Sequence, residues 1–343
     1  MNAHRFVPVM VLALLAPCAA RAQSVSKAGT VAAPFLEIPV GAAAIGMGGA
    51  FVSLANDASA LYWNSSGAAF QENTQLLVSH MEWIADTRFD FAALVVPMGD
   101  FGTIGVTFTS LAMGDMKVRT VELPEGTGEY FSASDIAAGL SYSRRLSDRF
   151  TVGVTAKYIQ QTIWHETATA FAFDLGTMFK TDLLGGLVIG AALSNFGTDM
   201  QLEGRDMRRF ARVDPTKLGS NDQVPYTLEV QSWDLPLLFQ LGLSFAPVRD
   251  DEYRWTIAAD AIHQSDNYES VNLGTEFAFQ EFLFVRAGYH SLFLAESEGG
   301  LSAGLGVASS ALFSTTTVFQ VDYAYRDMGR LNAVHTLSLS VRF

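Results

Sequence analysis

Alternating apolar and polar residues dominate the chain from residue 75 to its end. Within segments of about ten residues, every second side chain is large and apolar, and those between are small or polar. In residues 103–109, for example, Ile104, Val106 and Phe108 alternate with Gly105 and Thr107. A period of two is that of a β-strand, and about ten residues is the length of a tilted strand that crosses a membrane. The pattern therefore predicts membrane-crossing strands with one lipid-facing side and one inward side.

Residues 88–97 show the same period with larger side chains. Phe89, Phe91 and Val95 alternate with Asp90 and Ala92. As in the other segments, we expect the large apolar side chains to face lipid. The inward faces should then hold the charged strand residues, because a charge on the lipid face costs roughly 2–4 kcal/mol near the midplane. These residues are Lys157, Asp174, Lys180, Asp260, Glu276, Arg286, Asp322 and Arg326.

The connections between these segments provide an independent test. Counting all segments gives about fourteen strands, an even number as in single-chain bacterial barrels. Every connection from an even to an odd strand is short: 98–102, 147–149, 181–184, 248–253, 280–281 and 309–315. The two longest connections, 112–132 and 198–233, run from odd to even strands. Bacterial barrels have short periplasmic turns and long outer loops. Residues 75–343 are therefore predicted to form an all-β fold, a transmembrane antiparallel β-barrel of about 14 strands.

The end of the chain strengthens this prediction. Leu337, Leu339, Val341 and Phe343 alternate with small or polar residues, and the chain ends on Phe343. This resembles the C-terminal signature by which the barrel-assembly machinery recognises outer-membrane proteins. The alternative is an edge strand of a soluble protein, which would leave a long apolar edge exposed. We therefore interpret these four residues as a barrel-assembly signal.

The first residues have the pattern of an export signal. Arg5 precedes an apolar run over residues 6–15, and Ala20 and Ala22 are small residues at cleavage-site spacing. Residues 1–22 are predicted to be a signal peptide. Lipid attachment at Cys18 is the alternative, although Pro17 directly before it fits that reading poorly. Cleavage after Ala22 would remove the only cysteine, so the exported chain would have no disulfide.

Residues 34–67, PFLEIPVGAAAIGMGGAFVSLANDASALYWNSSG, do not fit the strand pattern. They are too apolar for a linker, and Gly46, Gly48 and Gly49 around Met47 indicate backbone packed against a surface or at positive φ. A short helix is expected after Asn56-Asp57. Such a segment needs a surface to cover it, and a barrel lumen supplies one. We therefore predict an N-terminal plug over residues 23–74, with residues 34–67 beginning at the periplasmic mouth.

The pattern PFLxIxxGAxAxGMGxAFVxxAxDxSAxYWN resembles the start of the PorV/PorQ family of outer-membrane proteins, relatives of the FadL-type fatty-acid channels. In that family the segment typically reads GARA before Gly-Met-Gly and ends in Asn-Pro-Ala-Gly. Here Ala43 stands at the Arg position, and Ser65 and Ser66 follow Asn64. The resemblance implies a place in the type IX secretion system, where such barrels receive cargo. A dinucleotide-binding glycine loop is excluded because no βαβ unit surrounds these glycines.

Composition narrows the possible functions. The net charge is −13, and no basic patch carries interleaved aromatic residues, so no nucleic-acid partner is expected. Past the first 22 residues no apolar run reaches the roughly 18 residues of a spanning helix. The histidines are scattered, and no serine stands in a nucleophile elbow. We expect no metal, no cofactor and no enzyme activity. A barrel phospholipase or protease stays open, because its triad would leave no local pattern.

Two hypotheses about function remain. The first is a cargo-binding or shuttle barrel of type IX secretion, with secretion components and cargo as partners beside outer-membrane lipid. The alternative is a FadL-like transporter of long-chain fatty acids or other hydrophobic small molecules. Candidate partner contacts in the outer loop are Arg205, Arg208, Arg209 and Arg212. Candidate plug or ligand contacts are Phe35, Leu36, Ile38, Gly46, Met47, Gly48, Gly49, Phe51, Trp63 and Asn64.

Overall fold

The computed structural model describes residues 27, 29–212, 216, 223–294, 297–309 and 317–343. The predicted signal peptide, residues 1–22 with Cys18, lies outside this part of the chain.

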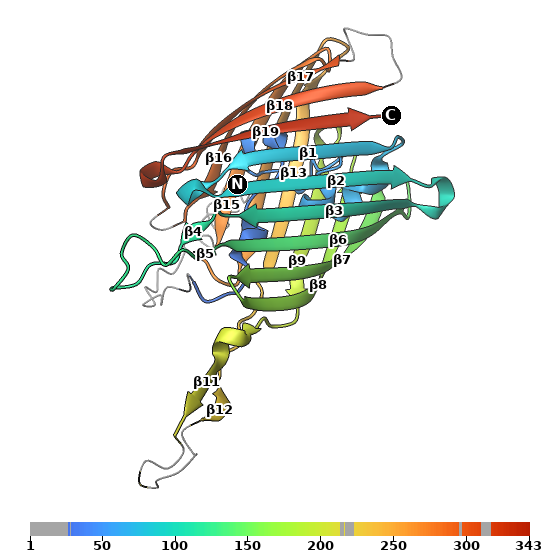
Figure 1. Cartoon of the computed structure of the whole chain (residues 1–343). Helices are drawn as coiled ribbons and strands as arrows, with labels where there is room; N and C mark the ends of the chain where they lie inside the picture. Colours follow the sequence, from blue (N-terminus) through green and yellow to red (C-terminus); the bar gives the residue numbers. More distant parts are fainter. Residues whose placement is uncertain (1–26, 28, 213–215, 217–222, 295–296, 310–316) are drawn as a thin grey trace, which may run out of the picture.

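Fourteen antiparallel strands close into a barrel (Figure 1), which confirms the predicted fold class. The barrel closes because β1 pairs with both β2 and β19, while β9 joins β8 to β13. The strands are β1 (Gln75–Glu82), β2 (Arg88–Pro97), β3 (Thr103–Ala112), β6 (Ala133–Arg145), β7 (Phe150–Ile163), β8 (Glu166–Lys180), β9 (Val188–Gly197), β13 (Leu238–Arg249), β14 (Tyr253–Gln264), β15 (Ser270–Phe279), β16 (Leu283–Leu292), β17 (Leu301–Ala308), β18 (Val318–Asp327) and β19 (Ala333–Arg342).

The two ends of the barrel differ in their connections. The two long loops, after β3 and β9, lie at one end together with the short turns after β1, β7 and β18, and we call the opposite end periplasmic. The loop after β3 contains the small hairpin of β4 (Met116–Lys117) and β5 (Tyr130–Phe131). The loop after β9 adds β10 (Glu203–Gly204) to the edge of β8. It then forms a second hairpin, β11 (Arg208–Ala211) with β12 (Val224–Thr227), which projects away from the barrel (Figure 1).

Among the described residues, helices are few and short. Four lie in the N-terminal segment: η1 (Pro34–Glu37), α2 (Ala42–Gly46), α3 (Ala60–Trp63) and η2 (Ser65–Phe70). The others lie in turns and loops: η3 (Ile84–Asp86), η4 (Gly99–Phe101), η5 (Leu183–Gly185), η6 (Arg205–Met207) and η8 (Gly329–Leu331). In the described residues, no helix has both the length and the apolar character needed to cross a membrane.

Side chains alternate between the two faces of the wall, as the sequence predicts. In β17, Leu301 and Leu305 are exposed on the outside, whereas Ser302 and Gly306 face the lumen. The lipid-facing side of the barrel is formed by such leucines, valines and aromatic residues. This separation accounts for a chain with many exposed apolar side chains and a polar interior.

The expectation for β2 is wrong. Phe89, Phe91 and Val95 are buried in the lumen, and Val96 is on the outside. The strand is apolar on both faces, so alternation alone does not say which face is inward. The reason for the apolar inner face is the plug, because Tyr62 of the N-terminal segment stacks edge-on with Phe91 at 6.2 Å between ring centroids. Burial of these apolar side chains against the plug stabilises an orientation that alternation alone does not predict.

The N-terminal segment crosses the lumen from the outer end to the periplasmic end. The Ala32 N–H donates to the Asp234 carbonyl in the outer loop (2.8 Å), and the Ala33 N–H donates to Gln161 near the outer end of β7 (3.0 Å). Phe70 then lies at the periplasmic end beside Lys180. The expectation that residues 34–67 begin at the periplasmic mouth is therefore wrong. The segment enters the lumen at the outer end and runs to the periplasmic end, where Gln75 begins β1.

Candidate functional site in the plugged lumen

Inward-facing glycines of the wall leave room for the plug backbone. A Cβ placed on Gly288 of β16 would lie 2.2 Å from the Gly48 nitrogen. A Cβ on Gly46 would lie 2.9 Å from the Cα of Gly304 in β17. Gly48 also has φ +68°, a conformation that favours glycine. The glycine-rich sequence of the plug therefore allows its backbone to pack directly on the backbone of the wall.

Polar side chains fix the plug at three further points. The buried Asp260 of β14 accepts hydrogen bonds from the Phe51 N–H (2.7 Å) and the Val52 N–H (2.9 Å). Ser338 of β19 accepts one from the Ala42 N–H (2.9 Å). Asn64 donates to the carbonyls of Val52 and Thr177, both at 3.0 Å, and so connects two parts of the plug with β8. These bonds satisfy backbone groups that have no strand partner.

Aromatic residues hold the plug together internally. The Trp63 indole donates to the Val40 carbonyl (3.0 Å), and the Tyr62 hydroxyl donates to the Ile38 carbonyl (2.9 Å). Phe51 lies edge-on to Trp63, with 6.2 Å between ring centroids. The predicted plug contacts are all buried, and most of them form the core of the plug: Phe35, Leu36, Ile38, Met47, Phe51, Trp63 and Asn64. The structure thus uses these residues for packing within the plug and against the wall.

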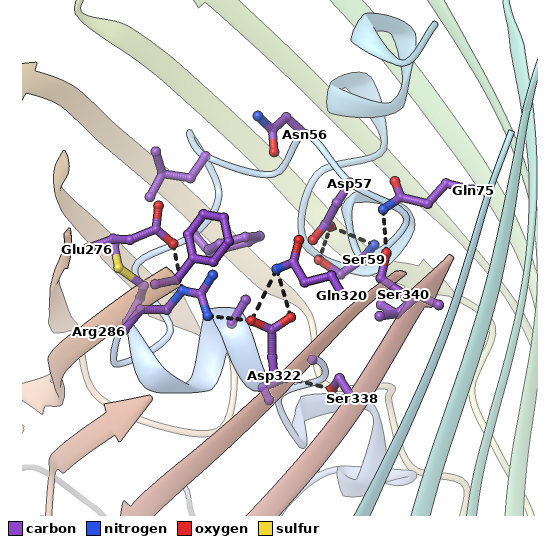
Figure 2. A pocket seen from close by; sticks show the side chains of 18 of the residues that line it. Asn56, Asp57, Ser59, Gln75, Glu276, Arg286, Gln320, Asp322, Ser338 and Ser340 are labelled. Atoms are coloured by element: carbon purple, nitrogen blue, oxygen red, sulfur yellow. Dashed lines mark hydrogen bonds and ion pairs between the residues drawn. The ribbon is translucent and has the colours of Figure 1, made fainter. Parts of the chain in front are cut away.

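Helix α3 differs slightly from the sequence expectation. Asp57 does not cap the helix itself, which begins at Ala60. Its carboxylate instead accepts hydrogen bonds from the Ser59 N–H (2.8 Å) and the Ser59 hydroxyl (2.5 Å). Burial raises the pKa of the Asp57 carboxyl, although these bonds from Ser59 lower it. Asp57 lies on the wall of a cavity between the plug and the barrel (Figure 2).

This cavity is polar and lies toward the periplasmic end. Its volume is about 280 Å³. Figure 2 shows the side chains of Asp57 and Ser59 from the plug facing those of Gln320 and Asp322 from the wall. Its polar lining consists of Asn56, Asp57, Ser59, Gln75, Arg254, Glu276, Glu281, Arg286, Gln320, Asp322, Ser338, Ser340 and Arg342. Such a lining favours water or a polar solute over a hydrocarbon.

A buried ion-pair network forms one side of the cavity. The Arg286 guanidinium donates to Glu276 and to Asp322, each at 2.6 Å (Figure 2). Arg254 donates to Glu276 (2.9 Å) and forms a two-bond contact with Glu281 at 2.6 and 2.9 Å. Arg286 and Arg254 thus each have carboxylate partners, as burial of a charge requires. Glu276, Arg286 and Asp322 face inward as the alternation predicts, whereas their pairing with one another and with Arg254 is not visible in the sequence.

A smaller cavity of about 60 Å³ lies nearer the outer end. Leu36, Glu37 and Trp63 of the plug face Lys157 and His290 of the wall there. Burial, helped by the nearby charge of Asp266, raises the pKa of Glu37 from 4.5 to about 7, against the opposing effect of a hydrogen bond from Gln264. These two cavities between plug and wall therefore have charged linings.

The predicted loop arginines lie outside the barrel. Arg205 contacts His165 in the turn between β7 and β8, and His165 bonds to Asp206 at 2.7 Å. These contacts attach the base of the hairpin to the barrel. Arg208 and Arg209 lie on β11, with Arg212 just after it, and all three are exposed. The four arginines are thus distributed along one projecting hairpin and its base, and they do not form one compact cluster.

The predicted barrel-assembly residues lie on β19 and directly after it. Leu337 and Leu339 are exposed on the lipid-facing side, and Val341 continues the same face. The exposed Phe343 donates its N–H to the Thr74 carbonyl at 2.9 Å. The last strand is therefore the one that closes the barrel onto β1.

Among the described residues, no three or more His, Cys, Asp or Glu side chains are grouped as a metal ion would require.

Solved structures define the fold class. The chain is similar to the toluene transporter TodX of Pseudomonas putida, with a TM-score of 0.53, 13% identity, and coverage of 88% of this chain and 97% of TodX. The toluene transporter TbuX of Ralstonia pickettii has a TM-score of 0.53 and 12% identity, with coverage of 89% of this chain and 97% of TbuX. A FadL homologue of Pseudomonas aeruginosa has a TM-score of 0.51 and 13% identity, with coverage of 89% of this chain and 98% of the homologue. By fold, the protein is a FadL-like β-barrel of the bacterial outer membrane.

A family model gives a narrower similarity than this fold class. Residues 21–188 match the model described as type IX secretion system protein PorV. The match covers just under half of the chain and includes the whole plug. It confirms the resemblance to PorV/PorQ proteins read from residues 34–67. A search of curated protein sequences finds no match.

Proposed function

We propose that this protein acts in type IX protein secretion as a cargo-binding or shuttle component of the outer membrane. The PorV family match supports this role. The observation that carries the proposal is the plug, which crosses the lumen from Ala33 to Phe70 and is fixed to the wall by Asp260, Ser338 and Asn64. A barrel closed in this way is suited to presenting a surface to a partner.

The charged lining of the lumen also favours the secretion role over transport of a hydrocarbon. The space left beside the plug is lined by ion pairs such as Arg286 with Asp322. Transfer of a hydrocarbon past such groups would separate them from their partners or from water, at a cost of several kcal/mol for each buried charge. The apolar side chains that a hydrocarbon would contact, including Phe35 and Trp63, already pack against one another and the wall.

The second candidate is transport of hydrophobic small molecules, as in a FadL-like channel. Its support is the fold shared with proteins described as toluene transporters. Under this proposal the plug would have to move, because the cavities that Leu36, Met47, Phe51 and Trp63 line have charged linings. We favour the secretion role for that reason. We propose no enzymatic activity, since the matched family and the similar structures are a secretion component and transport channels.

Co-purification tests the two proposals together. The tagged protein would be isolated from outer membranes in mild detergent, and its bound proteins and bound lipids identified by mass spectrometry. The secretion role predicts enrichment of secretion components and cargo proteins over a tagged, unrelated barrel. Recovery of fatty acid or hydrocarbon in near-stoichiometric amount, with no enriched protein, would overturn that role in favour of transport.

A further inference from the structure

Three cationic side chains meet at the periplasmic mouth of the barrel, around the last residue of the plug. The Lys180 ammonium lies 3.4 Å from the centre of the Phe70 ring, and the Arg145 guanidinium lies 5.3 Å from the same centre. Arg249 lies across the mouth, on the wall of a cavity that Lys180 and Phe70 also line. Lys180 is the last residue of β8, Arg145 of β6 and Arg249 of β13, and all three strand ends lie at the periplasmic end.

This group of cations is only partly neutralised by the protein, since one carboxylate, Glu281, lines the same cavity and is paired with Arg254. No ion pair joins Arg145, Lys180 or Arg249 to a carboxylate in the part of the chain that the structure describes, although Arg254 nearby is paired with Glu276 and Glu281. Arg249 is also directly opposite Arg254 in the β13–β14 register. Like charges placed opposite one another in a sheet repel. Glu281 offsets part of this repulsion, and an anion near Lys180 and Arg249 would offset the rest.

The side chains point toward the lumen and away from the bilayer. Arg145 continues the inward series of Ser141 and Ser143, and the intervening Arg144 is on the outer face. Lys180 follows the exposed Phe179 in the same way. Headgroups of the surrounding lipid would therefore meet Arg144 before they meet the cations of the mouth. This geometry favours a ligand that arrives from the periplasm.

The cavity at the mouth sets the size and character of that ligand. Its volume is about 640 Å³, within the range of roughly 300–1,000 Å³ that is usual for ligand sites. Apolar side chains, including Leu54, Phe70, Met178 and Phe245, share the lining with the cations Lys180, Arg249 and Arg254 and with one carboxylate, Glu281. A ligand that combines several carboxylates with apolar groups matches this lining. A free inorganic anion would leave most of the cavity unused.

We propose that the periplasmic mouth binds an extended acidic peptide segment, whose carboxylates are held by Lys180 and Arg249 and whose apolar side chains lie on Phe70. Because Phe70 is also the end of the plug, the bound segment would contact plug and wall at once. The site attracts acidic peptide locally, although the chain as a whole is acidic at −13.

Fluorescence anisotropy tests the site on the whole protein in nanodiscs of phosphatidylcholine. The probe is a fluorescein-labelled peptide of alternating Glu and Leu, and its control is the same peptide with Gln for Glu. We expect the Glu peptide alone to bind, and its affinity to fall as salt rises. Lys180→Gln and Arg249→Gln should each weaken binding about tenfold or more, as loss of a charge-assisted hydrogen bond does. Arg144→Gln, on the lipid side at the same height, should leave it unchanged.

Four results would overturn the proposal. The first two are equal affinity for the Glu and Gln peptides, and an equal loss of peptide affinity in Arg144→Gln and Lys180→Gln. The other two are Lys180-dependent binding of decanoate without binding of the peptide, and peptide binding seen only when the nanodisc contains phosphatidylglycerol. Heat-dependent gel migration of each variant shows whether its barrel is folded. Because no secretion component is present in the assay, failure here would leave the proposed secretion role standing.

Discussion

At the residue scale, Asp260 shows how one side chain fixes the plug. It is fully buried in the lumen, and one carboxylate oxygen accepts the N–H groups of both Phe51 and Val52. Two consecutive N–H groups on one oxygen hold the plug backbone at a defined distance from β14. An inward charge at this position follows from the alternation of the strand, whereas its role as an acceptor for the plug backbone does not.

Replacing Asp260 with alanine should loosen this attachment. Both N–H groups would be left buried without an acceptor, which costs roughly 1–3 kcal/mol for each group. We expect Asp260→Ala to unfold at lower denaturant concentration in detergent micelles, followed by tryptophan fluorescence. The control is Asp100→Ala, in an exposed turn. Equal stability of the two variants would show that these bonds do not hold the plug.

Glu37 gives the plug a pH dependence. Its carboxyl titrates near 4.5 when unfolded and at about 7 in the folded protein, because burial and Asp266 disfavour the charged form. Between these values the folded state holds the proton more tightly than the unfolded state does. The stabilising contribution is therefore full below pH 4.5 and is lost as the pH rises through 7.

This sign can be measured directly. The thermal midpoint of the wild-type protein should fall between pH 5 and pH 8, and Glu37→Gln should reduce that fall because glutamine does not titrate. The comparison between the two proteins removes the contribution of other groups. A fall of the same size in Glu37→Gln would assign the effect to a different residue.

At the element scale, the plug and the wall are matched through their glycines. The sequence predicts close packing at Gly46, Gly48 and Gly49, and the structure places the first two against Gly304 and Gly288. Which wall glycine meets which plug glycine could not be predicted, because that depends on the path of the plug through the lumen. The error on β2 has the same origin. A strand that is apolar on both faces takes its orientation from the plug that it covers.

A larger side chain at Gly288 should displace the plug. Its Cβ would lie 2.2 Å from the Gly48 nitrogen, so backbone must move. We expect Gly288→Val to raise the ion conductance of the barrel in planar bilayers, where the wild-type protein should be nearly closed. Gly114→Ala is the control, because a Cβ there has no neighbour within 4 Å. Unchanged conductance in a folded Gly288→Val variant would mean that the plug does not close the lumen.

The β11–β12 hairpin is the other element with a testable role. The hairpin and its base carry four arginines, Arg205, Arg208, Arg209 and Arg212. An exposed basic surface on an acidic protein attracts acidic partners. Changing these four arginines to glutamine should weaken co-purification of secretion components while the barrel stays folded. The matched control changes Lys117 and Arg119 to glutamine in the other long loop. If the two sets of substitutions weaken co-purification equally, the effect would come from the overall charge of the loops and not from this hairpin.

At the scale of the whole molecule, the barrel was predictable and its contents were not. Strand period, turn parity and the terminal Phe343 are local features, and together they specify fourteen strands and their direction. The ion pairs of Arg286 and the cation group at Lys180 join residues far apart in the chain. Their inward orientation follows from the alternation, but their neighbours follow only from the closed barrel.

The central claim is that this plugged barrel serves protein secretion and not uptake of hydrophobic molecules. The most direct measurement compares two outputs in one deletion strain: the amount of secreted protein at the cell surface, and the uptake of a labelled long-chain fatty acid. We predict that deletion lowers surface protein strongly, leaves uptake unchanged, and is reversed by the intact chain. Normal secretion with lost uptake would contradict the account.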